Sequence, residues 1–94
     1  MPSFKIAHIK EQGVDMIIVP VNVTFEDKTA SEQQAIVATL EAAAHTAGLA
    51  GTVVPVWDHG LGQMAFMAPK PWAPFFQNIG LEFVFRNINR ELSW

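Results

Sequence analysis

Apolar and polar residues alternate along the first quarter of the chain. Residues 4–10 alternate well enough for a strand and run into a turn that contains Gly13, which predicts a β-hairpin. In the next apolar run, residues 16–25, one face is formed by Ile17, Val19, Val21, Val23 and Phe25. Met16 and Ile18 make the beginning of the other face apolar as well. We therefore predict a long second strand with one core face and one partly covered face.

A helical period follows a short charged connection. Thr29 and Glu32 have the spacing of a capping box, in which each side chain binds the other residue's backbone N–H. Apolar residues then recur at helical spacing, at Ile36, Val37, Leu40, Ala43, Ala44 and Ala47. Gly48 is placed to end the helix in a left-handed conformation. The pattern predicts a helix that begins after Thr29 and lies against a sheet.

The second half of the chain repeats the order of hairpin and helix. Residues 52–58 and 63–68 are two apolar runs around a glycine-bearing turn, and the prolines of 69–71 end the sheet. Residues 72–79 predict a short helical turn that breaks at Gly80. A last helical stripe is formed by Leu81, Val84, Phe85, Ile88 and Leu92, with Phe83 outside it.

These elements predict an α+β fold with the order ββαββα, in a single domain that spans residues 1–94. We expect a four-stranded mixed sheet with two helices packed on one face. Two strand orders, 2-1-4-3 and 1-2-3-4, are compatible with a right-handed crossover. We favour 2-1-4-3 because Pro20 and Pro55 lack a backbone donor and are best tolerated on edge strands.

The composition points to a covered surface. Apolar residues make up 50% of the 94 residues, more than one small core is expected to hide. We therefore expect a homo-oligomer, most simply a dimer, or a surface that a protein partner or an apolar small molecule covers. The N-terminal residues lack the pattern of a signal peptide and no apolar run is long enough to span a membrane, so we expect a cytoplasmic protein without a membrane partner.

Charge and cysteine content narrow the classes of function. The net charge is −3 and the six basic residues are scattered singly, which argues against nucleic acid as a partner. The absence of cysteine excludes thiol catalysis, disulfides and cysteine-based zinc sites. His8, His45 and His59 have none of the spacings of a metal motif. We predict neither a metal site nor a cofactor.

Asp58 and His59 suggest a general base with an orienting acid, but neighbouring strand residues point to opposite faces. Residues of these types are also common in turns, and the sequence shows no serine nucleophile motif. The single turn glycines at 60 and 62 do not make a phosphate-binding loop. We therefore predict no catalytic residues and favour a protein that is not an enzyme.

The aromatic residues offer the candidate surface. Trp57 and Trp72 are difficult to bury fully in a small chain, since an indole N–H needs a partner. Phe83 is difficult to bury because it lies outside the helical stripe. The candidate ligand or partner surface consists of Trp57, Asp58, His59, Trp72, Phe75, Phe76, Phe83 and Trp94. Our first hypothesis is a self-association or binding module that uses this surface or an uncovered sheet face. The alternative is a small-molecule protein or enzyme with an apolar pocket between the sheet and residues 69–80, lined by Trp57, His59 and Trp72.

Overall fold

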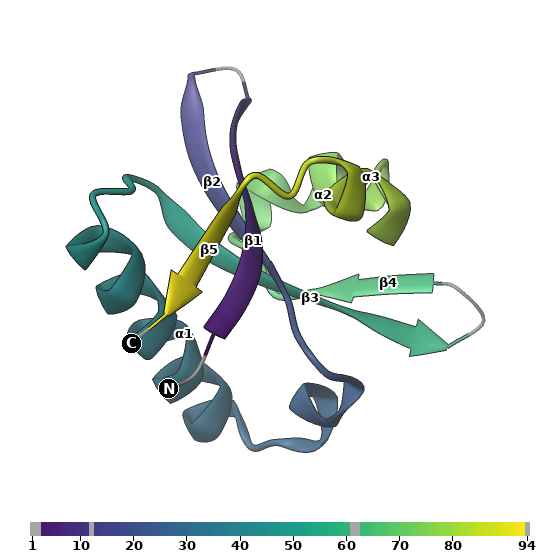
Figure 1. Ribbon diagram of the computed structural model, residues 1–94. Helices are drawn as coiled ribbons and strands as arrows, with labels where there is room; N and C mark the ends of the chain where they lie inside the picture. The colour runs from purple at the N-terminus through teal and green to yellow at the C-terminus, as the bar shows by residue number, and fades with distance from the viewer. Residues whose placement is uncertain (1–2, 12, 61–62, 94) are drawn as a thin grey trace.

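A computed structural model of the chain describes residues 3–11, 13–60 and 63–93. It is an α+β fold with a mixed five-stranded sheet (Figure 1). In chain order the elements are β1 (Ser3–Glu11), β2 (Val14–Pro20), the 3-10 helix η1 (Val23–Asp27), α1 (Ala30–Thr46), β3 (Thr52–Gly60), β4 (Gln63–Phe66), the 3-10 helix η2 (Lys70–Trp72), α2 (Ala73–Gln77), α3 (Leu81–Arg86) and β5 (Arg90–Ser93).

The strand order is β4-β3-β2-β1-β5. The preferred order 2-1-4-3 is therefore wrong, and the alternative 1-2-3-4 is correct for the first four strands. Strands β2 and β3 are parallel, with Met16 opposite Thr52, whereas the other neighbouring pairs are antiparallel. Both predicted hairpins are confirmed, and Gly13 has the positive φ of 79° that the first turn needs.

The two prolines lie in interior strands, at points where a neighbouring ladder ends. Pro55 accepts a hydrogen bond from Met67 N, so its missing N–H would face the β4 side, just past the last residue of β4. Val21 N donates to Val56 O, so Val21 faces β3, and the residue before it, Pro20, faces β1. The ladder of β1 with β2 has already ended at Ile18. Neither proline therefore interrupts a ladder.

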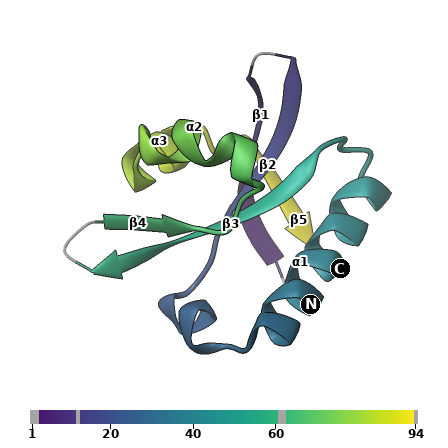
Figure 2. The ribbon, with the colours of Figure 1, turned by 180° about the vertical axis from the view of Figure 1, so that it is seen from behind.

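Helices cover both faces of the sheet, so the prediction of two helices on one face is wrong. On one face α1 packs over a core of Ile6, Ile17, Val19, Leu40, Ala44, Val53 and Leu92. On the other face η2, α2 and α3 pack over Ala7, Met16, Ile18, Val54, Val56, Phe76 and Val84. The η2–α2 segment lies behind the sheet in Figure 1 and in front of it in Figure 2.

Helix α1 begins as predicted. Thr29 Oγ1 accepts from Glu32 N at 3.2 Å, and Glu32 Oε1 accepts from Thr29 N at 3.1 Å. The bond from the Thr29 backbone N–H, together with that from its hydroxyl, holds the pKa of Glu32 below its ordinary value of 4.5. The helix ends before Gly48, whose φ is 85°.

Two segments differ from the sequence prediction. The second strand ends at Pro20, and Phe25 belongs to η1 rather than to a continuous strand. The last helix ends at Arg86, and the chain continues as a fifth strand that pairs with the first half of β1. Phe85, which the helical stripe assigned to the core, is 57% exposed, whereas Phe83 is partly buried.

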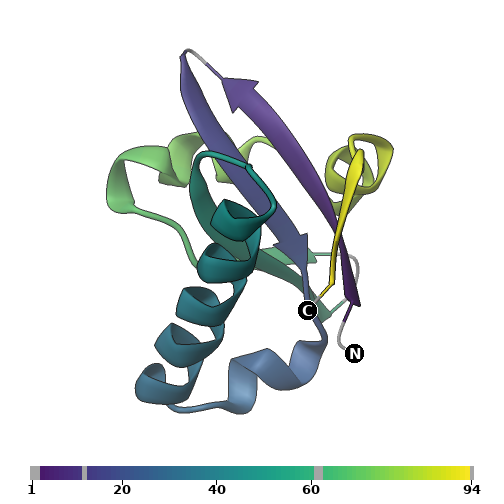
Figure 3. The same cartoon turned by 60° about the vertical axis from the view of Figure 1, so that its left-hand side comes forward.

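A side-chain amide extends the pairing of β5 with β1, the last and first strands along the chain, which are neighbours in the sheet (Figure 3). Asn89 N donates to Ile6 O, Asn89 Oδ1 accepts from His8 N at 2.9 Å, and Asn89 Nδ2 donates to His8 O at 2.9 Å. The Asn89 carboxamide therefore takes the place that a backbone peptide group would have in the ladder.

Replacement of the cap should weaken α1 in a pH-dependent way. We expect Thr29→Ala to lower the free energy of unfolding by about 1 kcal/mol at pH 7. Because the folded-state pKa of Glu32 is lowered, its contribution is present above pH 4.5 and is lost as the pH falls through the lower folded value. The penalty of Thr29→Ala, measured by urea unfolding, should therefore be smaller at pH 3. Thr39→Ala, in the middle of the same helix, is the control, and an equal penalty at both pH values would contradict the prediction.

Removal of the Asn89 carboxamide should loosen β5. We expect Asn89→Ala to lower the free energy of unfolding by about 1 kcal/mol, because two hydrogen bonds of His8 are lost at a solvent-accessible site. Hydrogen exchange at the His8 amide should become faster than in the wild type. Ser93→Ala, in the same strand, should leave that amide unchanged. Unchanged protection of His8 in Asn89→Ala would show that the carboxamide does not hold the strand.

Candidate functional site

The candidate aromatic residues lie on opposite faces of the sheet. Val53 belongs to the core under α1 and Val54 to the other core, so alternation along β3 places Trp57 on the α1 side. Trp72 and Phe75 pack on the opposite core, with Phe76 inside it. The expected pocket that combines Trp57 and His59 with Trp72 is therefore not formed by these residues. Trp94 lies outside the described residues.

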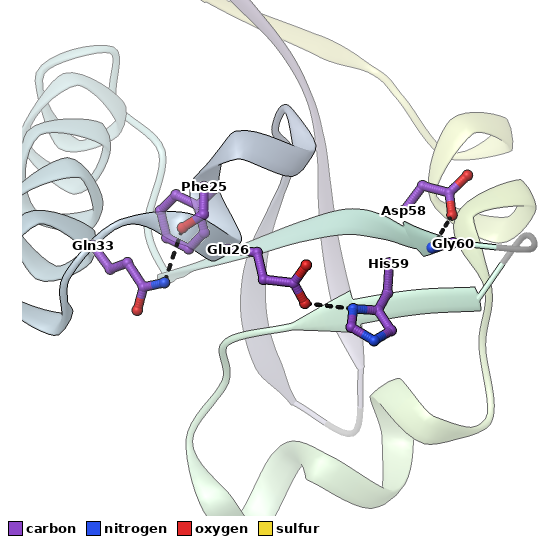
Figure 4. Close-up of polar contacts among 6 residues, drawn as sticks. All are labelled: Phe25, Glu26, Gln33, Asp58, His59 and Gly60. Carbon is purple, nitrogen blue, oxygen red and sulfur yellow. Dashed lines mark hydrogen bonds and ion pairs between the residues drawn. The ribbon is translucent and has the colours of Figure 1, made fainter.

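On the α1 side, Trp57 is part of a closed corner with η1. Its side chain is only 7% exposed, and its ring centroid lies 5.1 Å from that of Phe25 at an interplanar angle of 53°. Gln33 of α1 fixes η1 by donating from Nε2 to Phe25 O at 2.9 Å (Figure 4). Among the described residues nothing accepts from Trp57 Nε1, which is buried. The corner is packed rather than open.

His59 and Asp58 do not form a dyad. The ladder of β3 with β4 shifts between Asp58 and Gly60, which leaves His59 as the extra residue of a bulge. His59 Nδ1 contacts Glu26 of η1, whereas Asp58 Oδ1 accepts from Gly60 N at 2.9 Å, as in an Asx turn (Figure 4). Both His59 and Glu26 are largely exposed, so their ion pair, present when His59 is protonated, fastens the hairpin weakly.

The histidines are engaged separately. His8 Nε2 lies 2.9 Å from Ala50 O, and His45 Nε2 lies 3.3 Å from Gly51 O. Over residues 3–11, 13–60 and 63–93, no three His, Asp or Glu side chains are grouped as a metal site would require. None of the helices in this part of the chain is long and apolar enough to cross a membrane.

The opposite face contains a pocket of about 500 Å³ between the outer end of the β1–β2 hairpin and the η2–α2 segment. The hairpin contributes Glu11, Val14 and Met16. The η2–α2 segment and the two residues after it contribute Pro71, Trp72, Pro74, Phe75, Asn78 and Ile79. Over the residues that the structure describes, the lining is therefore mainly apolar and aromatic, with two polar side chains, Glu11 and Asn78.

Phe76 anchors the α2 wall of this pocket. It is fully buried between α2 and the sheet, and its ring centroid lies 5.4 Å from that of Phe66 and 5.2 Å from that of Phe75. Phe75 in turn meets Phe83 of α3 edge to face at 6.2 Å. This aromatic chain fixes α2, and Trp72 and Phe75 are left at its margin to line the pocket.

The polar side chains that line the pocket among the described residues offer more hydrogen-bond acceptors than donors. Glu11 is half-buried, and within the described residues no ion pair or hydrogen bond engages its carboxylate. Asn78 Nδ2 donates to Pro74 O at 2.8 Å, which orients the amide and leaves Oδ1 and the second N–H of Nδ2 without a partner among the described residues. A ligand in this pocket would therefore meet more acceptors than donors on these side chains.

Of the residues that line the pocket, the sequence identified Trp72 and Phe75. Val14 and Met16 could have been recognised from the sequence, because alternation along β2 places them on the same apolar face as Ile18. No sequence pattern indicated Glu11 as a pocket residue, because its position beside α2 depends on how a distant segment folds over the hairpin. Comparisons of this chain with protein families, with curated proteins and with solved structures gave no match.

Proposed function

We propose that this domain binds a small, largely apolar organic ligand in the pocket between the β1–β2 hairpin and the η2–α2 segment. The pocket itself is the observation that carries the proposal. Its volume of about 500 Å³ is in the range of ligand sites, and such sites combine mainly apolar walls with a few polar groups. Trp72 and Phe75 supply the aromatic wall, and Glu11 and Asn78 supply the polar groups.

The lining supports binding rather than catalysis. Acid–base catalysis uses a positioned acid or base, commonly with a second group that orients it or shares its proton. Among the described residues, Glu11 is the one ionisable side chain that lines this pocket, and the other lining side chains are apolar or amide. His59, the base suggested by the sequence, contacts Glu26, a residue of η1. We therefore propose a binding protein.

Burial on both sheet faces weakens the composition argument for self-association. Strands β2 and β3 place apolar side chains in two cores instead of one. Among the described residues, the large apolar side chains that remain exposed are Val23 and Phe85. The apolar excess is thus accommodated within one chain, and the pocket is the better supported site.

Binding to the pocket should depend on Trp72. We expect the neutral probe N-phenyl-1-naphthylamine to bind saturably, with a rise in probe fluorescence. Trp72→Ala should weaken binding at least about tenfold, because loss of a buried aromatic contact costs about 1.5–3 kcal/mol. Val14→Phe, which fills the pocket from the hairpin side, should also weaken it. Circular dichroism would establish that each variant is folded.

The matched control is Phe85→Ala, which removes an exposed aromatic residue of α3 that does not line the pocket. It should leave the affinity unchanged. Probe binding that does not saturate, or that is the same in all variants, would contradict the proposed site.

Self-association through strand β4 is a second candidate function. β4 is an edge strand of the sheet, and its residues, Gln63 to Phe66, carry no charge. The other edge strand, β5, carries the exposed charged residues Arg90 and Glu91, which is how edge strands are commonly protected from pairing. A second copy of the chain could therefore add its β4 to this edge.

Light scattering on a sizing column over a range of concentrations tests this second candidate. If the wild type is dimeric, Ala65→Lys on β4 should shift it to monomer, because a charge on the edge opposes strand pairing. Ser93→Lys on the β5 edge should leave the mass unchanged. A wild type that is monomeric at every concentration would exclude the β4 dimer.

A further inference from the structure

The carboxylate of Glu11 gives the pocket a negative charge, which favours some classes of ligand over others. Alternation along β1 places Ala7, Ile9 and Glu11 on the side of η2 and α2, so the Glu11 carboxylate stands at the same pocket as Trp72 and Phe75. It is half-buried and, within the described residues, has no basic partner. An unpaired carboxylate in a partly apolar site is better stabilised by a cation than by a neutral or anionic group.

Lys10 of β1 and Lys70 of η2 are not partners of this carboxylate. Lys10 precedes Glu11 on β1, and by alternation its side chain is on the opposite face. Lys70 begins η2 but is not among the residues that line the pocket. In the part of the chain that the structure describes, the ion pairs are His59 with Glu26 and Arg86 with Glu82, neither of which involves Glu11.

We infer that the ligand of this pocket is an organic cation, an ammonium or quaternary ammonium group on an apolar body. Three features of the lining suit it. The carboxylate of Glu11 supplies the opposite charge, the aromatic faces of Trp72 and Phe75 attract a cation through their π systems, and Asn78 Oδ1 accepts from an N–H. The inference rests on the proposed function, since it assigns a chemical class to the ligand of the same pocket.

Three probes of similar size separate charge from shape: benzyltrimethylammonium, its uncharged isostere neopentylbenzene, and the anion benzenesulfonate. Each would be titrated against bound N-phenyl-1-naphthylamine on the full chain. We expect the cation to displace this reporter at least about tenfold more effectively than its neutral isostere, because the Glu11 carboxylate supplies most of the attraction and the faces of Trp72 and Phe75 add a cation–π contact. The anion should displace it least.

Glu11→Gln keeps the shape of the side chain and removes its charge. It should abolish most of the preference for the cation over its neutral isostere. Glu91→Gln on β5 removes the same charge from an exposed strand at the edge of the sheet and is the control for net charge. It should retain the preference.

The outcomes separate the two proposals. If the reporter binds but cation and isostere compete equally, the cation inference is overturned and the pocket stands. An equal loss of preference in Glu11→Gln and Glu91→Gln would also overturn it, because overall charge would then explain the selectivity. If none of the probes, the reporter included, binds the wild type, the proposed function fails and the inference fails with it.

Discussion

The fold depends on the burial of both faces of the parallel pair β2 and β3. Along β2, Ile17 and Val19 point into the core under α1, while Met16 and Ile18 point into the core under α2 and α3. A strand that is apolar on both sides is stable in water only when both sides are covered, as in other sheets with parallel strands. This constraint brings the short C-terminal helices over the second face and creates the surface on which the pocket lies.

The interior position of these strands also explains where the prolines are tolerated. A proline removes one donor, and the loss is harmful where a neighbour expects that donor. In β3 the donor missing at Pro55 faces the β4 side just past the last residue of β4, and in β2 Pro20 lies beyond the last pair of the β1–β2 ladder. The rule that assigns proline to edge strands is therefore too coarse: the relevant edge is the end of a ladder, which can lie inside the sheet.

What the sequence predicted well was local. The capping box of Thr29 and Glu32, the glycine that ends α1 and the two hairpins depend on residues close together in the chain. The features that the sequence did not predict depend on contacts between residues that are far apart in the chain. The apolar stripe from Leu81 to Leu92 suits a helix, yet the helix ends at Arg86, and Leu92 is buried instead as part of a strand that completes the sheet beside β1. No period within the segment could show that the first half of β1 needed a partner.

A related reason separates the residues that the sequence grouped into one candidate surface: the sheet lies between them. Trp57 closes one face against Phe25, whereas Trp72 stands at an opening on the other. The two faces of the sheet differ in accessibility because different helices pack on them. A helix of 17 residues covers one, and the other is covered by the short segments η2, α2 and α3, with Pro71 and Pro74 in the first turns of η2 and α2. Short segments cover less of a sheet than one long helix, so the hairpin end beside them remains accessible. The pocket, and the unpaired carboxylate in it, follow from that incomplete cover.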